Sequence, residues 1–454
     1  MWRRRLLIMI RVEWQTFCYS TQLKCLCVYW RDMRIRKGTR MVQTSADMAN
    51  RTYTVYNNSL DQEIQVNSTG AKILRNINNN NYVDNTDETE FIKQLIETGI
   101  VIDDEEWTGN DKAFLGTRCL FKYPLTALSI ELVDYCNLSC KHCYGKFSTN
   151  NKVKNAISLD RIKKLYEELG YLHTKKIALT GGEVTLHPLF VEIAMFFLER
   201  GFDLTILTNG YNYLVLEKLL EASRDYHYTI KVSLDGIGST HDLIRGKEGT
   251  FSRVEKTIAR ILKYSNVTLY ISTVIMRQNV ENIEKMKQYV EEKYPSAFHT
   301  FDFIFPEGNA TIENTFTVAE MKKIMETYPR LFVTEMSVSS KKDKFRCTGG
   351  ITQCTLSYDG TLKICNSACN DMFRFRNNAF QKGLAYSWKH CGANIKKFRN
   401  EKNHKTKDCN RCKNVKFCNV RDCRIMALAY SKDVNRSNPI TCCTTELLQE
   451  RSRI

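Results

Sequence analysis

Between residues 125 and 310, segments rich in β-forming residues alternate six times with segments of helical periodicity. Alternation of this kind predicts a parallel sheet whose strands are joined by right-handed crossovers. We therefore expect an α/β fold, a partial (β/α)6 TIM-like barrel over residues 122–310. Such barrels place their reactive residues at the carboxyl ends of the strands. The predicted strands lie in LTALSIELVD, KKIALTGG, FDLTILTNG, YTIKVSLDG, VTLYISTVIM and FHTFDFIF.

Unusual residues follow the first four of these strands. Cys136, Cys140 and Cys143 form a CxxxCxxC motif after the first, and TGGE, TNG and SLDG follow the next three. A structural zinc ion would need a fourth ligand, and we expect the His142 side chain to diverge from the three thiols. A [4Fe–4S] cluster held by three thiolates would instead keep one iron open. Three reduced core cysteines are the remaining alternative.

The four motifs, in this order and at these strand ends, resemble the radical S-adenosylmethionine (SAM) superfamily. The resemblance implies that Cys136, Cys140 and Cys143 hold a [4Fe–4S] cluster whose open iron chelates the amine and carboxylate of SAM. One electron would then cleave SAM to methionine and a 5′-deoxyadenosyl radical, which abstracts a hydrogen atom. An electron donor such as flavodoxin or ferredoxin is implied as a partner.

The same resemblance implies SAM-binding roles at the other strand ends. Gly181, Gly182 and Glu183 are expected to bind the SAM amine, because glycines allow close backbone approach and a carboxylate pairs with an ammonium. A GGE sequence by itself is more often only a turn at the end of a strand.

Further SAM contacts are expected after the third, fourth and fifth strands. Ser233 and Asp235 stand where relatives bind the ribose, and Arg245 would pair with the SAM carboxylate. A lone arginine is, however, more often a surface residue. Asn209 and Thr273 are the remaining expected pocket contacts.

Cysteine dominates the chain beyond residue 340, where 11 of the 18 cysteines fall between Cys347 and Cys443. Because apolar residues are scarce there, we expect metal centres to organise this segment. The cysteine pattern of residues 340–450 resembles the SPASM domain, which carries two auxiliary [4Fe–4S] clusters. The resemblance implies one cluster on Cys347, Cys354, Cys365 and Cys423, and another on Cys409, Cys412, Cys418 and Cys442.

This segment departs from the family pattern at two points. Four residues, not three, separate Cys418 from Cys423, and the last ligand is ambiguous between Cys442 and Cys443. The CxxC pairs equally permit a zinc-ribbon-like pair of sites. Two cysteines of the segment have no assigned role, Cys369 and Cys391.

A small unit precedes the barrel, at residues 52–105. YTVYNN and EIQVNS predict two short strands around a turn, and TGAKILRNI and a segment starting near Asp87 predict two helices. This winged-helix-like pattern resembles the PqqD-like peptide-recognition domain of maturases for ribosomally made peptides. Such domains capture a leader peptide as an added strand. The alternative is a packing subdomain without a ligand.

The first 50 residues form a basic extension that we expect to be poorly structured. Residues 1–40 carry ten Lys or Arg residues against Glu13 and Asp32, and the whole chain has a formal charge of +17. The extension is either translated sequence upstream of Met41 or Met48, or a disordered basic arm. The remaining positive charge fits solvated helix faces, so we expect no nucleic-acid partner. The apolar stretch Leu6–Ile10 is too short for a signal peptide or a membrane span, which predicts a cytoplasmic protein whose cysteines stay reduced.

The whole layout most resembles the sactipeptide synthases, which join a cysteine sulfur to the α-carbon of another residue. In that reading an auxiliary cluster holds the substrate thiolate or accepts the surplus electron. Sulfatase-maturing relatives carry an aspartate base after the second SPASM cysteine, where this chain has Asn366, which cannot accept a proton at neutral pH. Epimerisation and carbon–carbon cross-linking stay open. A non-enzymatic zinc protein that binds nucleic acid is the alternative of a different class.

Overall fold

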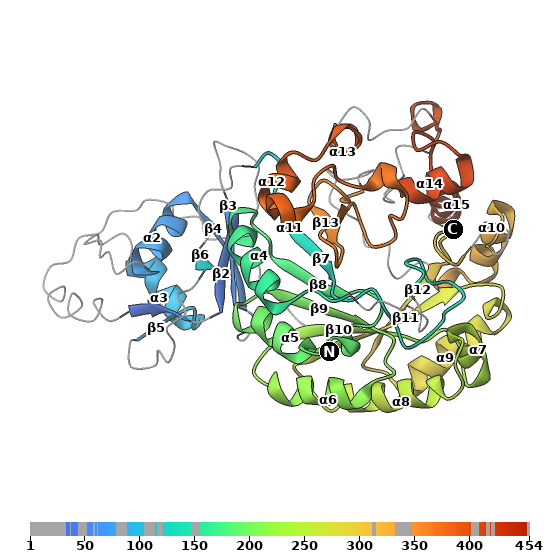
Figure 1. Ribbon diagram of the computed structural model, residues 1–454, viewed down its shortest axis with the longest axis horizontal. Coiled ribbons are helices and arrows are strands. Elements are labelled where there is room, and N and C mark those ends of the chain that lie inside the picture. The colour runs from blue at the N-terminus through green and yellow to red at the C-terminus, as the bar shows by residue number, and fades with distance from the viewer. Residues whose placement is uncertain are drawn as a thin grey trace, which may run out of the picture.

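A parallel sheet forms the centre of the molecule (Figure 1). The structure, a computed structural model, describes residues 33–36, 38–43, 52–57, 60, 62–78, 89–103, 114–115, 121–147, 155–310, 315–331, 347–400, 408–414, 418 and 423–451. The six predicted strands are β7 (Ala127–Glu131), β8 (Lys176–Thr180), β9 (Asp203–Thr208), β10 (Tyr228–Ser233), β11 (Val267–Ile275) and β12 (Phe298–Phe303). They pair in parallel and in sequence order, so the predicted α/β fold is confirmed.

Helices connect these strands and bury one face against the sheet. Their bounds are α4 (Leu159–Tyr171), α5 (Phe190–Glu199), α6 (Tyr213–Ala222), α7 (Ser239–Arg245), α8 (Thr250–Ile261), α9 (Ile283–Lys293) and α10 (Val318–Thr327). On α8, for example, the buried apolar residues are Val254, Ile258 and Ile261, at the three- and four-residue spacing of one helix face. Ser158 caps α4 by accepting a hydrogen bond from the Arg161 N–H.

The C-terminal segment continues the central sheet. β13 (Gln353–Leu356) pairs in parallel with β7, and β14 (Leu362–Lys363) closes an antiparallel hairpin with β13. Among the described strands, β12 and β14 are the two edges of this sheet, so the barrel is open there. The helices that follow are α11 (Ala379–Lys382), α12 (Leu384–Lys389), α13 (Ala393–Arg399), α14 (Arg424–Ser431) and α15 (Pro439–Arg451).

Apolar packing organises residues 347–400, which corrects the expectation that metal centres alone would do so. Trp388 is fully buried, stacks on Phe375 with ring centroids 5.4 Å apart, and donates its indole N–H to the Tyr123 carbonyl. Phe373 and Leu384 belong to the same buried cluster as the sheet residues. Because these few large side chains each bury much apolar surface, the segment has an apolar core although apolar residues are scarce in it.

The N-terminal unit has its own buried apolar cluster. β3 (Thr52–Asn57) and β4 (Gln62–Asn67) form the expected antiparallel hairpin, and α2 (Ser68–Asn78) and α3 (Thr89–Glu97) follow it. The start of the second helix near Asp87 lies outside the described residues. Two further pairings complete the unit: β2 (Thr39–Gln43) lies between β3 and β6 (Phe114–Leu115), and β1 (Met33–Ile35) pairs with β5 (Val101–Asp103).

The expectation of a poorly structured extension is wrong for residues 33–36 and 38–43, which contain β1 and β2. Arg40, on β2, is fully buried against the barrel. Its guanidinium lies 3.6 Å from the Phe202 ring centroid and donates to the Tyr56 hydroxyl and to the carbonyls of Thr174 and Arg200. The last two residues precede β8 and β9, so the N-terminal unit rests on the amino edge of the sheet. Residues 1–32 and 44–50 of the predicted extension lie outside the described residues.

Replacing Arg40 should loosen this contact. Arg40→Met keeps the aliphatic stem but removes the donors to two carbonyls at a buried junction, which we expect to cost about 2–3 kcal/mol of stability. Thermal denaturation and limited proteolysis should show earlier release of the N-terminal unit. The matched change Arg161→Met, at an exposed arginine stacked on Phe380, should have little effect, and equal effects of both changes would contradict the assignment.

Candidate functional site

The loop that carries the three cysteines is held by the turn after β8. The backbone N–H groups of Gly182 and Glu183 donate to the carbonyls of Val133 and Tyr135, both at 3.0 Å. A Cβ atom on Gly182 would lie 1.8 Å from the Tyr135 carbonyl oxygen, and Gly181 has a φ of +135°. Only glycine fits both positions. We expected these glycines to allow a close backbone approach to SAM. In the structure they allow a close approach to the chain's own backbone at Val133 and Tyr135.

Cys136, Cys140 and Cys143 lie near one another on this loop. Burial, with smaller contributions from Glu183, Cys140 and Cys143, raises the pKa of Cys136 to about 12. In the described part of the chain no three Cys, His, Asp or Glu side chains converge tightly enough to hold a single metal ion. A cubane cluster binds each thiolate through a different iron, so its ligands stand further apart than those of zinc. Three thiols on one loop are the donor set that a [4Fe–4S] cluster with one open iron requires.

Glu183 joins the ends of β8 and β9. Its buried carboxylate accepts hydrogen bonds from the N–H and hydroxyl of Thr185, the hydroxyl of Thr208 and the N–H of Asn209. Burial raises the pKa of Glu183, and these four donors oppose that shift. The sequence did not predict this internal role, and contact with the SAM amine stays a prediction.

Asn209 links the end of β9 to the cysteine loop. Its side-chain amide donates to Asn137 Oδ1 at 2.9 Å and toward Cys136 Sγ at 3.6 Å. Its own oxygen accepts from the N–H of Tyr211. This predicted pocket residue therefore does reach one of the cysteines.

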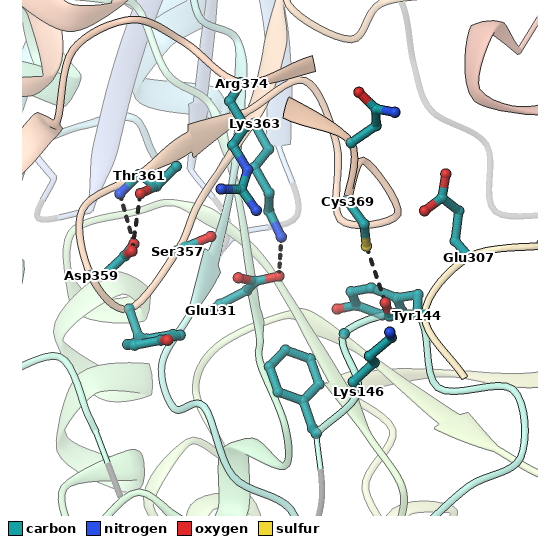
Figure 2. Close-up of a pocket in the computed structure, with 15 residues that line it drawn as sticks. Glu131, Tyr144, Lys146, Glu307, Ser357, Asp359, Thr361, Lys363, Cys369 and Arg374 are labelled. Carbon is teal, nitrogen blue, oxygen red and sulfur yellow. Dashed lines mark hydrogen bonds and ion pairs between the residues drawn. The ribbon is translucent and has the colours of Figure 1, made fainter. Parts of the chain in front are cut away.

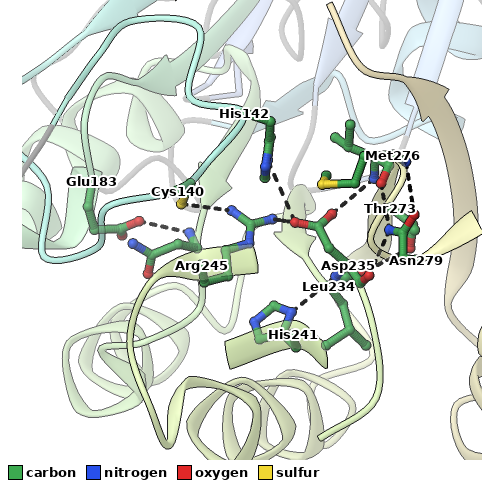
Figure 3. A network of polar contacts seen from close by, with 12 residues as sticks. Cys140, His142, Glu183, Leu234, Asp235, His241, Arg245, Thr273, Met276 and Asn279 are labelled. Atoms are coloured by element: carbon green, nitrogen blue, oxygen red, sulfur yellow. Dashed lines mark hydrogen bonds and ion pairs between the residues drawn. The ribbon is translucent and has the colours of Figure 1, made fainter. Parts of the chain in front are cut away.

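A buried ion pair between Arg245 and Asp235 lies next to Cys140 (Figure 3). Arg245 Nη2 lies 2.6 Å from Asp235 Oδ2, and Arg245 Nη1 donates toward Cys140 Sγ at 3.7 Å. Burial would raise the pKa of Asp235, but Arg245, His142 and the Val274 N–H hold it below its usual value. We expected Asp235 at a ribose and Arg245 at the SAM carboxylate. The structure pairs them with each other, because two opposite buried charges stabilise one another, and their contacts with SAM stay predictions.

The other predicted SAM contacts have different surroundings. Ser233 is half-buried at the end of β10, and its ribose contact stays a prediction. Thr273 is buried, donates to the Leu234 carbonyl and contacts His299 Nε2 at 2.8 Å, so it supports the strand ends. His142 turns toward Asp235, 3.6 Å away, and burial lowers its pKa to about 4.

Three of the four cysteines assigned to the first auxiliary cluster lie together. Burial, with smaller contributions from the nearby Cys347 and Cys423, raises the pKa of Cys365 to about 12. Cys354 is buried on β13, where Arg399 is its charged neighbour. The previously unassigned Cys391 also lies beside Arg399. The structure thus gives Cys354 a partner that the sequence did not predict.

The second set of C-terminal cysteines lies partly beside α15, since Asp408, next to Cys409, accepts from the Ser437 N–H just before this helix. Cys409 and Cys412 flank the 3₁₀ turn Cys409–Arg411, and the Thr445 hydroxyl lies 3.3 Å from Cys418 Sγ. Cys442 precedes Thr445 by three residues and shares its helix face. Cys443 is buried in the apolar cluster that includes α10. This geometry favours Cys442 over Cys443 as the last ligand.

A cavity of about 430 Å³ lies between the cysteine loop and the C-terminal hairpin (Figure 2). Lys363, on β14, reaches across it to Glu131 at the end of β7, with Nζ 2.7 Å from Oε1. Cys369 lines the same cavity and donates to the Tyr144 carbonyl at 3.0 Å. Residues of the barrel and of the cysteine-rich segment therefore share one cavity at the carboxyl end of the sheet.

Several residues of this site had no motif to reveal them, namely Glu131, Asn137, Lys363 and Cys369. A carboxylate at the end of a strand that is otherwise apolar, as in SIELVD, is the one sequence signal that marks Glu131. Lys363 gave none, because its partner is 232 residues away in the chain.

Removing the carboxylate of Asp235 should destabilise the site. Asp235→Asn leaves Arg245 without its buried counter-charge, which we expect to cost about 3 kcal/mol. Thermal denaturation of the purified chain measures this loss. Ser233→Ala, two residues away and half-buried, should be nearly neutral for stability, and an equally stable Asp235→Asn variant would contradict the role of the ion pair.

The part of the chain that contains this site is similar to known proteins. Residues 130–290 match the radical SAM superfamily. An AdoMet-dependent heme synthase of Methanosarcina barkeri is 29% identical over 201 residues, which are 44% of this chain and 56% of that protein. The antilisterial bacteriocin subtilosin biosynthesis protein AlbA of Bacillus subtilis is 27% identical over 256 residues, 54% of this chain and 55% of that protein. The chain thus spans about half the length of the curated relatives it matches.

A solved structure extends the likeness in fold beyond the matched domain. Streptococcus suis SuiB, crystallised with precursor peptide SuiA, has a TM-score of 0.59 at 18% identity, over 90% of this chain and 99% of SuiB. No described helix of the present chain is long and apolar enough to cross a membrane. Residues 130–290, which match the radical SAM superfamily, include the three cysteines and the strand ends around them.

Proposed function

We propose that this chain is a radical SAM peptide maturase that removes a hydrogen atom from a ribosomally made precursor peptide. The observation that carries the proposal is the cavity shared by the cysteine loop and the C-terminal hairpin. It gives an extended substrate room next to residues 144–147, which directly follow Cys143. The names of AlbA and SuiB, a bacteriocin biosynthesis protein and a protein crystallised with a precursor peptide, support the same substrate class.

In this proposal, Cys136, Cys140 and Cys143 hold a [4Fe–4S] cluster, and the cluster with SAM supplies the 5′-deoxyadenosyl radical. Arg245 favours the thiolate form of Cys140, because its guanidinium donates toward Sγ. Asp235 holds that guanidinium in place. The Asn209 side-chain amide donates toward Cys136 Sγ and so favours the thiolate form of that cysteine as well. Glu183 joins the two strand ends that carry these groups.

The residues that line the cavity determine which charges a substrate would meet there. Lys363 and Glu131 neutralise one another. Burial raises the pKa of Glu307, which also lines the cavity. Lys146 and Asp359 line it as well, so a peptide segment there would meet charges of both signs.

We infer that the product is a thioether between a cysteine sulfur and a carbon of the same peptide. The cross-linked product has two hydrogen atoms fewer than its precursor. Asn366, which replaces the aspartate of sulfatase-maturing relatives, pairs with the Thr355 hydroxyl at 2.7 Å, which supports this choice over sulfatase-type oxidation. Carbon–carbon cross-linking and epimerisation are the alternatives that product mass and structure distinguish.

Residues 52–105 are proposed to hold the leader of the precursor. β4 is an edge of the four-stranded sheet, and no other described strand pairs with its outer side. A leader could add there as a further strand. The unit rests on the amino edge of the barrel, and the cavity lies at the carboxyl edge, so the precursor would have to pass along the barrel. The Arg40 contacts support the alternative, a purely packing subdomain.

Three further parts of the proposal complete it. Two auxiliary [4Fe–4S] clusters occupy the C-terminal segment, a flavodoxin or ferredoxin supplies electrons, and the protein works in the reducing cytoplasm. The competing proposal of a zinc protein that binds nucleic acid explains the net charge of +17 and the CxxC pairs. It does not explain the ion pair behind Cys140.

Iron analysis tests the cluster assignment. Anaerobically purified protein should be brown and contain about twelve iron atoms per chain, and a variant with Cys136, Cys140 and Cys143 changed to Ala should retain about eight. With dithionite as reductant, the wild type should release 5′-deoxyadenosine from SAM and Cys140→Ala should not. A colourless zinc protein would overturn the proposal, and SAM cleavage by Cys140→Ala would refute the ligand assignment.

Filling the cavity should separate peptide modification from SAM cleavage. Thr361→Trp places a large side chain at the hairpin turn that lines the cavity, so peptide turnover should fall at least about tenfold, equivalent to 1.4 kcal/mol. SAM cleavage without peptide should persist, as mass spectrometry of both products would show. Thr327→Trp, exposed on α10, is the control. Unchanged peptide turnover by Thr361→Trp would place the substrate elsewhere.

A further inference from the structure

A basic surface lies where α7 ends and α8 begins, beside the cysteine loop. It consists of Lys141 on the loop, Lys247 in the turn between the helices, and Arg253 and Lys256 on α8, all exposed. Glu248 lies in the same turn, and the Asp242 carboxylate accepts from the Gly249 and Phe251 N–H groups there, so two carboxylates stand beside these four cations. We call these four cations the α7–α8 basic surface.

This surface touches the backbone of the cysteine loop. The N–H groups of Ser139 and Lys141 donate to the carbonyls of Arg245 and Ile244, at 3.2 and 3.1 Å. Gly246, with a φ of +71°, passes so close that a Cβ atom there would lie 2.6 Å from the Ser139 carbonyl oxygen. The turn that carries Lys247 is therefore packed directly on the segment between Cys136 and Cys140.

Aromatic rings contact cations of this surface, but no described carboxylate neutralises them. Lys247 and Arg253 lie 4.2 and 4.3 Å from the Tyr211 ring centroid, and Lys256 lies 5.9 Å from that of Tyr213. No carboxylate within the described part of the chain forms an ion pair with them, whereas Arg260, further along α8, pairs with Glu217 at 3.1 Å. Contact with an aromatic ring leaves the positive charge facing the solvent.

Tyr211 also connects this surface to the cluster site. Its N–H donates to Asn209 Oδ1 at 2.9 Å, and the Asn209 amide reaches Cys136 Sγ at 3.6 Å. Beside the cations, Leu243 on α7 is 57% exposed, and Ile237, just before α7, is 39% exposed. A charged rim beside exposed apolar side chains is the composition of a transient protein interface.

We propose that the α7–α8 basic surface docks a small electron-carrier protein with an acidic face around its redox group. This rests on the proposed function, which consumes one electron for each SAM molecule cleaved. The carrier's flavin hydroquinone would lose that electron and become the semiquinone, and the cluster on Cys136, Cys140 and Cys143 would gain it. Complementary charge would speed the encounter and orient the carrier over the cysteine loop.

Binding of oxidised flavodoxin, measured by titration at ionic strengths of about 0.05 and 0.5 M, tests the docking surface without requiring turnover. The double variant Lys247→Glu/Arg253→Glu should weaken binding at least about tenfold at low salt and remove most of its salt dependence. The control Lys163→Glu/Lys164→Glu changes the net charge equally, at two exposed lysines of α4. It should bind flavodoxin as the wild type does.

Turnover separates this proposal from the proposed function. With dithionite, both double variants should cleave SAM at the wild-type rate, and only Lys247→Glu/Arg253→Glu should fail with reduced flavodoxin. Absence of cleavage by the wild type with dithionite would sink the proposed function, while the titration would still decide the docking surface. Wild-type binding by the test variant, or an equal loss by the control, would overturn the docking proposal. Should charge reversal lower the thermal midpoint, Lys247→Gln/Arg253→Gln must still weaken binding several-fold.

Discussion

The contact between the glycine turn after β8 and the backbone of Val133–Cys136 is the constraint on which the rest of the site depends. It leaves no room for a Cβ atom on Gly182, and it sets where the cysteine loop leaves the sheet. Once that loop is set, Asn209 can reach Cys136 and Arg245 can reach Cys140. The positions of the polar side chains therefore follow from a backbone packing that any larger residue would break.

The second constraint is that a buried charge needs a partner of opposite sign, and the site contains ion pairs of this kind. Asp235 compensates Arg245 behind the cysteine loop, and Glu131 compensates Lys363 in the cavity. Glu131 and Lys363 are 232 residues apart in the chain, so their pair also fixes how two distant segments sit together. Because removing one partner leaves an uncompensated buried charge, both pairs hold the geometry more firmly than a surface ion pair would.

The residues that the sequence identified and those it missed differ in a physical way. The strands follow from local patterns, and the parallel sheet confirms them. The three cysteines follow from their spacing, and their role stays a prediction. Asp235 and Arg245 were identified by their motif, but their pairing with each other was not, because a motif does not show which of its polar groups satisfy one another. The scarcity of apolar residues beyond residue 340 concealed the packing of Trp388, and the basic composition of the first 50 residues concealed β1 and β2.

The sequence by itself determined the α/β class, the strand ends that carry chemistry and the spacing of the cysteines, since these depend on residues close together in the chain. Only the tertiary structure decided that Glu183 is satisfied by four internal donors, that Lys363 reaches Glu131, and that Cys354 lies beside Arg399. Those contacts join separate elements of the fold, and burial selects them by requiring a partner for each polar group removed from water. No local pattern encodes that requirement.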